Sequence, residues 1–73
     1  MIRYDFAKKK ALEIDDKVNA CIEFDIGHKF FDQNDNRVGD QSIVILKENG
    51  NAISFMTFLT DYEPNNKFKK IEF

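Results

Sequence analysis

The 73-residue sequence contains one cysteine, one proline, three glycines and no tryptophan. A single thiol, Cys21, excludes an internal disulfide and a cysteine-rich zinc site. So few glycine and proline residues leave no flexible linker, and the length predicts a single domain over residues 1–73. A domain of this size buries only about 60% of the surface that its unfolded chain exposes, so its core has to be economical.

Long hydrophobic runs and a strong charge of either sign are also missing. Residues 50–60 are uncharged, but this stretch is far shorter than the roughly 20 residues of a membrane-spanning helix. Residues 1–16 lack the apolar run of a signal peptide. We therefore expect a cytoplasmic protein that does not associate with membranes. The net charge of −2 gives no overall basic excess of the kind that binding to nucleic-acid phosphates usually requires.

The first sixteen residues are compatible with two structures. Residues 7–13 are mostly good helix formers, and Asp5 suits the cap of a helix from Phe6 to about Ile14. The alternating apolar residues within residues 2–6 would instead suit a strand. We prefer the short helix. Three residues would share one of its faces: Ala7, Ala11 and Ile14.

A regular alternation of apolar and polar residues runs from Val18 to Ile26 and predicts a strand. One face would lie in the core, and the wetter face would carry Cys21, Glu23 and Asp25. Gly27 would break or bend this strand. Phe30–Phe31 and Arg37–Val38 would then form the two sides of a short hairpin across a polar loop.

Asn49-Gly50 lies between two apolar runs and is the strongest hairpin signal in the chain, since a type I′ turn needs positive φ at both central residues. That turn would place Leu46 opposite Ile53 and Val44 opposite Phe55. Both strands carry apolar residues on both faces, which predicts a position in the middle of the sheet, with residues 52–60 as the second strand. Residues 68–73 predict a final strand, with Ile71 and Phe73 on one side.

Residues 12–18 lead into about five short strands, which resembles the entry to small SH3-like or OB-like barrels, with Asp15 in place of the usual glycine. The resemblance carries no function. The whole pattern predicts an α+β fold that is mainly β. We expect a small antiparallel sheet of four or five strands, curled or barrel-like, with one short N-terminal helix.

The spacing of Asp32, Asn34 and Asn36 is similar to the start of a calcium-binding loop. Such a loop needs glycine at its sixth position and glutamate at its twelfth, where this chain has Arg37 and Ile43. We therefore interpret the segment as a polar turn and expect no metal site.

His28 is the only histidine, and no nucleophile motif accompanies it. We interpret it as a structural or surface residue, and Cys21 as a small packing residue rather than a reactive thiol. No phosphate-binding glycine loop or dinucleotide fingerprint is present. We therefore expect no catalytic residues, no cofactor and no enzymatic activity.

Charged residues provide two candidate binding surfaces. A protein partner with a basic surface would meet an acidic group and its neighbouring polar loop, namely Glu23, Asp25, Asp32, Asp35, Arg37 and Asp40. Acidic residues of this kind also keep an edge strand soluble. The alternative is a nucleic-acid patch, formed if the chain ends meet, from Lys8, Lys9, Lys10, Lys67, Lys69 and Lys70. Aromatic stacking would assist it, through Phe30, Phe31, Tyr62 and Phe68.

We prefer a non-enzymatic protein-binding module as the function. Short, acidic-leaning chains without motifs resemble the inhibitors with which phages and mobile elements block host or defence enzymes. Two alternatives stay open: a nucleic-acid-binding small β-barrel and a self-associating structural module. Both a monomer and a homodimer are compatible with the sequence.

Overall fold

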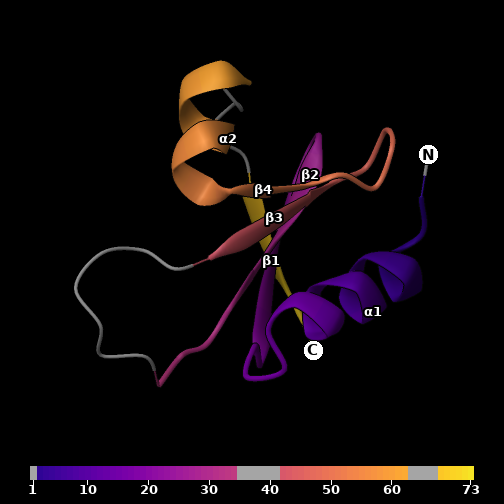
Figure 1. The fold of residues 1–73 in the computed structure, drawn as a ribbon, viewed down its shortest axis with the longest axis vertical. Helices are drawn as coiled ribbons and strands as arrows, with labels where there is room; N and C mark the ends of the chain where they lie inside the picture. Colours follow the sequence, from indigo (N-terminus) through magenta and orange to yellow (C-terminus); the bar gives the residue numbers. More distant parts are fainter. Residues whose placement is uncertain (1, 35–41, 63–67) are drawn as a thin grey trace.

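The computed structural model describes residues 2–34, 42–62 and 68–73. This part of the chain forms a five-stranded antiparallel sheet and two helices (Figure 1). In chain order these are α1 (Tyr4–Ile14), β1 (Ala20–Phe24), β2 (Gly27–Phe31), β3 (Ile43–Leu46), β4 (Ala52–Ser54), α2 (Phe55–Asp61) and β5 (Phe68–Ile71). The α+β, mainly β class and the N-terminal helix are confirmed.

The strand order is β4-β3-β2-β1-β5, so β4 and β5 lie at two edges and the sheet is not closed into a barrel. Residues 12–18, which resembled a barrel entry, form instead the end of α1 and its connection to β1. Within the described ranges, no helix combines the length and the apolar character needed to cross a bilayer.

Helix α1 begins two residues earlier than predicted. Arg3 holds the N-cap position without a side-chain hydrogen bond, and Asp5 lies in the first turn, where a carboxylate favours the positive end of the helix dipole. Ala7 and Ala11 are fully buried as expected. Ile14 is 53% exposed, because it is the last helical residue and the chain turns directly after it.

Strands β1 and β2 form a hairpin that the sequence did not reveal. Gly27 does not end the pattern; it begins β2 after a two-residue connection, Asp25-Ile26. A side chain at Gly27 would lie 3.0 Å from Val44 Cγ1 and 3.2 Å from the Ile45 carbonyl oxygen, so glycine permits β2 to approach β3. The hairpin that was predicted between residues 30–31 and 37–38 does not match the pairing of Phe30, which pairs with Ile43. Arg37 and Val38 lie outside the described residues.

The structure confirms a hairpin at Asn49-Gly50, but its two strands pair in a different register from the one predicted. Gly50 has φ +74°, and its N–H donates to the Leu46 carbonyl at 2.8 Å, which makes a four-residue loop over residues 47–50. The prediction of a two-residue turn was therefore wrong, and Val44 pairs with Ile53 rather than with Phe55. The shift is two residues, so the side chains of β3 and β4 keep their predicted faces.

Residues 52–60 are not one long strand. After three residues of β4, the Ser54 hydroxyl oxygen accepts a hydrogen bond from the Thr57 N–H at 3.2 Å and caps α2. Phe58 is then fully buried against the sheet. The N-cap and the helical spacing of Phe55 and Phe58 override the β propensity of this segment.

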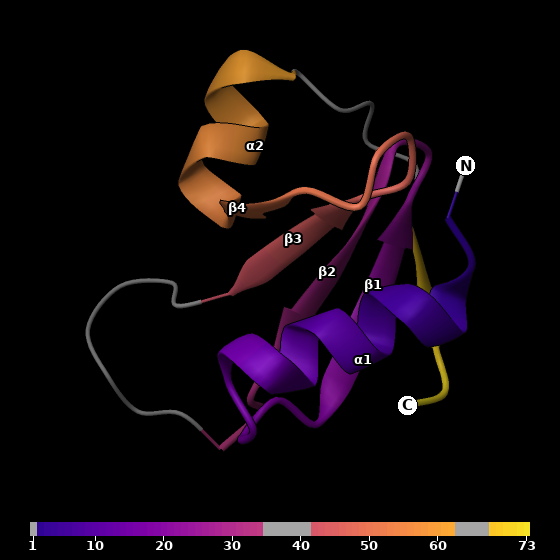
Figure 2. The same cartoon turned by 45° about the vertical axis from the view of Figure 1, so that its right-hand side comes forward.

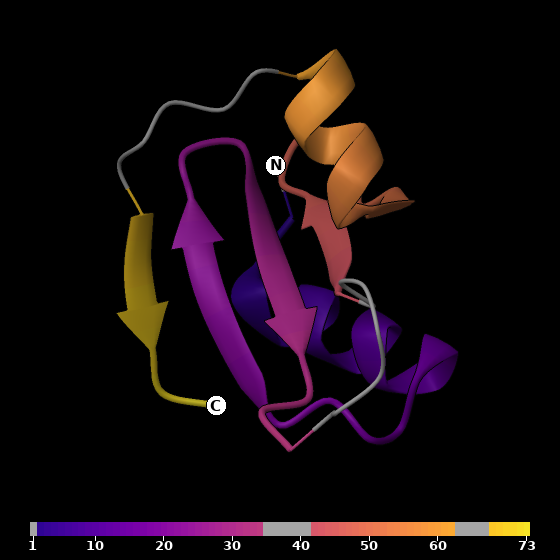
Figure 3. The same cartoon turned by 90° about the vertical axis from the view of Figure 1, so that its left-hand side faces the viewer.

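Each face of the sheet carries a small core. Helix α1 covers one face over β2 and β3 (Figure 2), where the buried residues are Ala7, Ala11, Val18, Cys21, Phe30 and Ile45. Helix α2 covers only the β3–β4 side of the other face (Figure 3), where the buried residues are Phe24, Val44, Leu46 and Phe58. Strand β3 is thus buried on both faces as predicted, but β2 takes the central position.

The predicted final strand is confirmed as β5, which pairs with β1. Ile71 and Phe73 pack against the α1-side core, on one side of the strand as expected. Among the described elements, neither helix lies over β1 and β5 on the α2 side (Figure 3).

Candidate functional site

Of the six residues that were predicted to contact a protein partner, the structure describes three, and each of them lies in a different element or connection. Glu23 lies in β1 on the α1 side, Asp25 is exposed in the β1–β2 connection, and Asp32 follows β2. The other three, and Lys67 of the alternative patch, lie outside the described residues: Asp35, Arg37 and Asp40.

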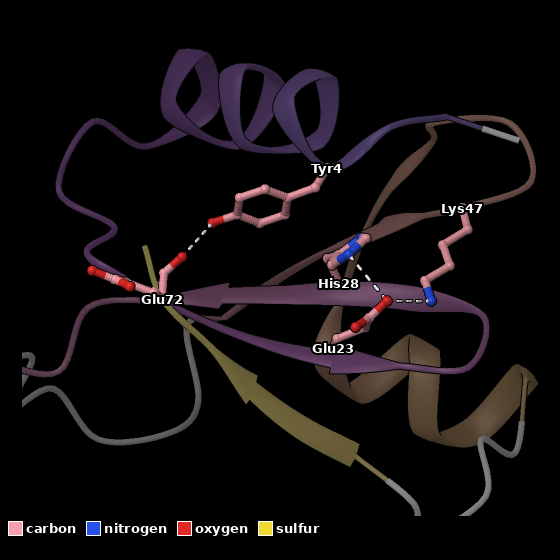
Figure 4. A network of polar contacts seen from close by, with 5 residues as sticks. All are labelled: Tyr4, Glu23, His28, Lys47 and Glu72. Carbon is pink, nitrogen blue, oxygen red and sulfur yellow. Dashed lines mark hydrogen bonds and ion pairs between the residues drawn. The ribbon is translucent and has the colours of Figure 1, made fainter.

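Glu23 belongs to a polar cluster at the α1 side of the sheet (Figure 4). Lys47 Nζ donates a hydrogen bond of 2.8 Å to Glu23 Oε2, and His28 Nε2 lies 3.7 Å from the same oxygen. Strand pairing makes this cluster, since Glu23 is the cross-strand partner of both His28 and Lys69. Its carboxylate is therefore engaged within the chain.

His28 is 4% exposed, and its ring lies beside the rings of Tyr4 (5.4 Å) and Phe30 (6.2 Å). Its buried Nδ1 atom has no hydrogen-bond partner among the described residues. Burial, and next the charge of Lys47, lower the pKa of His28, while the Glu23 carboxylate opposes this shift. The neutral imidazole therefore fits the site, which agrees with a structural role.

The pKa of Glu23 is also lowered, first by the hydrogen bond from Lys47 and then by its charge and those of His28 and Lys69, against the effect of burial. We expect both shifts to make the fold sensitive to acid. As the pH falls, the unfolded chain takes up a proton at His28 near the ordinary pKa of 6.5 and at Glu23 near 4.5, before the folded chain does. The free energy of unfolding therefore decreases as the pH falls through each of these two windows. The contribution of His28 is present above about pH 6.5 and lost as the pH falls through its lowered folded pKa, and that of Glu23 is present above about pH 4.5 and lost below.

Urea unfolding measured at a series of pH values checks this expectation. The His28→Gln variant should lose the decline in the upper window and keep the decline below the ordinary pKa of Glu23. A stability that rises as the pH falls through the upper window would contradict the account of His28.

Cys21 does not lie on a wet face: it is 2% exposed and packs beneath α1. The prediction from alternation was wrong because the face that carries Cys21 is the one that α1 covers. Burial, and next the Glu23 carboxylate, raise the pKa of the thiol to about 12. A packing role is thereby supported.

We expect the Cys21 thiol to react with Ellman's reagent only when the chain unfolds. The raised pKa lowers the thiolate fraction at neutral pH by about a thousandfold, and burial also blocks access. Absorbance recorded with and without urea measures the effect. Equal rates in the two solutions would show that the thiol is accessible in the folded chain.

Asp32 makes the polar turn that the sequence indicates. Its Oδ1 atom accepts hydrogen bonds from the Asn34 N–H at 2.9 Å and from Asn19 Nδ2 at 3.1 Å. Asn19 Oδ1 in turn accepts from the Gln33 N–H at 2.9 Å. These bonds fix the end of β2 against the start of β1 and give Asp32 a local structural role.

The two basic clusters meet only in part. Lys8 Nζ donates to the Phe73 main-chain oxygen at 2.9 Å and lies 4.3 Å from the centre of its ring, so α1 is in contact with the segment that follows β5. Lys10 Nζ donates to the Gly50 carbonyl, and Lys69 faces Glu23 across the sheet. Lys9 and Lys70 are exposed, and Lys70 points to the α2 side of the sheet, away from α1.

Exposed apolar side chains are also found on the elements at the other side of the sheet, in α2, directly after it and in β5. We call four of them the α2-side patch: Met56 (64% exposed), Leu59 (45%), Tyr62 (44%) and Phe68 (60%). The Phe24 ring connects the strand and helix parts of this patch, since it lies 5.8 Å from the Phe68 ring and 5.3 Å from the Phe58 ring. The interpretation of residues 52–60 as a strand concealed this surface.

Lysines accompany the aromatic rings on the same face. Lys29 Nζ lies 3.9 Å from the centre of the Phe55 ring and 5.4 Å from that of Phe31. Lys70 is the cross-strand neighbour of Ile22 and shares its face. The strand positions of β1, β2 and β5 that point to this side hold no carboxylate.

A hollow of about 320 Å³ opens at the end of the sheet that is nearest to the C-terminal end of α2. Two connections meet there, the one between β1 and β2 and the loop between β3 and β4. The hollow is lined by Asp25, Ile26, Leu46, Lys47, Glu48 and Tyr62. It therefore adjoins the α2-side patch through Tyr62.

The protein matches no protein-family model, no curated protein and no solved structure.

Proposed function

We propose that this chain is a small non-enzymatic protein-binding module whose α2-side patch contacts the partner. The exposed side chains of Met56, Leu59, Tyr62 and Phe68 carry the proposal. Clustered exposed apolar groups mark interaction sites in soluble proteins, and methionine and aromatic residues are enriched in protein interfaces.

Charges near Tyr62, at the end of the patch away from Lys29 and Lys70, favour a partner that is basic at that end. Asp61 ends α2, and Asp25 and Glu48 line the hollow beside Tyr62; all three carboxylates are on exposed residues. Glu23 is a weaker candidate for a direct contact, because Lys47 holds its carboxylate. An inhibitor from a phage or a mobile element that covers a host or defence enzyme would be one such module.

Affinity capture from the source cell tests the proposal, with the wild-type chain and two variants as baits. The first variant, Met56→Lys/Leu59→Lys, adds charge to the patch at exposed helical positions that do not form the core. The control, Ile14→Lys, adds charge to an equally exposed residue on α1. Circular dichroism verifies that all three baits are folded.

We expect one protein to bind the wild-type chain and the control, and to bind the patch variant about thirtyfold more weakly when purified, as for the loss of interface hot spots. Equal binding to all three baits would overturn the proposal. A mass that rises with concentration in light scattering, and stays monomeric in the patch variant, would also overturn it, since a second copy would then cover the patch.

A second candidate function is binding of single-stranded nucleic acid on the part of the sheet that α2 leaves uncovered. Lys29 and Lys70 share this face with Phe31 and Phe68, which combines basic and stacking groups as single-strand binding proteins do. Fluorescence anisotropy with labelled oligonucleotides at low salt tests it, because the phosphate contribution is strongest there. Binding that weakens with salt and with Lys70→Gln would support this function, and no binding at low salt would remove it.

A further inference from the structure

We infer that Asn49 is a site of covalent modification by deamidation, and that the docking of α1 sets the rate of this reaction in the folded chain. The reaction uses the Asn49-Gly50 pair, which the proposed binding surface does not use. The modification is independent of the proposed function. It would change the loop of residues 47–50, whose first two residues line the hollow beside α2.

Deamidation requires an asparagine followed by a residue whose main-chain nitrogen is open to approach. The Gly50 nitrogen gives up its proton and attacks the side-chain carbonyl carbon of Asn49, so that a C–N bond forms and ammonia leaves. A water molecule then opens the resulting succinimide ring at either of its carbonyl carbons. The products are aspartate, with the main chain unchanged, and isoaspartate, in which the main chain passes through the former side chain. Glycine favours the first step, because no Cβ atom hinders its nitrogen.

Hydrogen bonds within the loop hold both reacting groups in the folded chain. The Gly50 N–H donates to the Leu46 carbonyl oxygen at 2.8 Å, and Asn49 Oδ1 accepts from the Asn51 N–H at 2.9 Å. The first bond retains the proton that has to leave, and the second directs the side-chain carbonyl to a different amide. Since the reacting atoms need both contact and orientation, the loop has to open before they react.

Contacts from the start of the chain and from α1 keep this loop closed (Figure 2). Lys10 Nζ donates to the Gly50 carbonyl oxygen, and the Ile2 N–H donates to the Lys47 carbonyl oxygen at 2.8 Å. The Phe6 ring lies against Gly50, since a Cβ atom built on this glycine would be 3.1 Å from Phe6 Cε1. Opening of the loop therefore disrupts the contacts that dock the first half of α1.

The two products differ in their effect on the hairpin. Aspartate keeps an oxygen acceptor for the Asn51 N–H, so the loop can close again with one more negative charge beside Glu48. Isoaspartate adds a methylene group to the main chain before Gly50, and the former side-chain carbonyl becomes part of that chain. The spacing that closes the hydrogen bond between Gly50 and Leu46 then changes. We therefore expect isoaspartate to weaken the contact between the loop and α1.

Incubation of the purified chain at mildly alkaline pH, in buffer and in urea, tests the inference. Peptide mapping by mass spectrometry measures the conversion of Asn49 and separates the two products. We expect conversion in the folded chain to be about thirtyfold slower than in urea, because two hydrogen bonds have to break first. Equal rates in the two solutions, or no conversion in urea, would overturn the inference.

Two variants test the role of α1 after circular dichroism has verified that both are folded. Lys10→Met removes the hydrogen bond to Gly50 and keeps a long side chain. It should raise the rate in buffer about tenfold, as for the loss of a charged hydrogen bond, and leave the rate in urea unchanged. Lys9→Met is the matched control at an exposed residue of the same helix and should alter neither rate. An unchanged rate in folded Lys10→Met, or an equal rise in Lys9→Met, would contradict the role of α1.

Discussion

Replacing Phe30 with alanine is expected to leave most of the chain unfolded at room temperature. Phe30 lies in the central strand, pairs with Cys21 on one side and with Ile43 on the other, and is fully buried. Its ring packs against those of Tyr4 and Phe73, at 6.0 and 6.3 Å between centres. One side chain therefore contributes both to the contact with α1 and to the contact with the end of the chain.

The expected loss in the free energy of unfolding is as large as the whole stability of a domain of this size. Truncation of a buried phenylalanine costs about 3–5 kcal/mol, and a domain of this length without disulfides is stable by only about 3–5 kcal/mol. Far-ultraviolet circular dichroism during urea titration measures the loss. Phe6→Ala provides the matched control, because the Phe6 side chain is 52% exposed and should contribute much less. A Phe30→Ala variant that unfolds at the wild-type urea concentration would contradict this account of the core.

Replacing Phe58 with alanine is expected to detach α2 and to abolish binding of the partner. Phe58 is the one fully buried residue of α2, and its ring lies 5.3 Å from Phe24 and 6.4 Å from Phe55. A helix of seven residues is not stable in isolation, so its packing against the sheet maintains it. Truncation of the Phe58 ring should lower the free energy of unfolding by about 3–5 kcal/mol. The lost contacts belong to the core on the α2 side of the sheet, which supports the helix that carries the patch.

Stability and binding should respond together in this variant. Urea unfolding measures the first and calorimetry with the purified partner measures the second. Met56→Ala is the control for the stability measurement, because it truncates an exposed side chain on the same helix and should leave the free energy of unfolding nearly unchanged. Wild-type affinity in a destabilised Phe58→Ala variant would mean that α2 does not form the binding surface.

Signals within short segments of the sequence were sufficient to predict α1, β1 and the position of one hairpin. Helix formers in residues 7–13 predicted α1, the alternation after Val18 predicted β1, and Asn49-Gly50 predicted the position of a hairpin. The register of that hairpin could not be derived in the same way. Gly50 suits both a two-residue and a four-residue loop, and the choice between them depends on packing against the rest of the sheet.

The candidate site depends on contacts between distant residues, which a single sequence does not display. Glu23 and Lys47 are 24 residues apart, and only the pairing of β1 with β2 and of β2 with β3 brings them together. The α2-side patch was missed for a different reason, since residues 52–60 suit a strand by composition. The spacing of Ser54 and Thr57, with Phe55 and Phe58 on one helical face, was the signal that would have revealed α2.

The proposal that α2 faces the partner is tested most directly by amide hydrogen exchange of the chain alone and in complex with its purified partner. We expect slower exchange in the complex at residues 55–62 and at the rim of the hollow, residues 25–26 and 46–48. The exposed side of α1, residues 8–13, should exchange at the same rate in both states. Protection confined to α1, with unchanged exchange in α2, would contradict the proposed mode of binding.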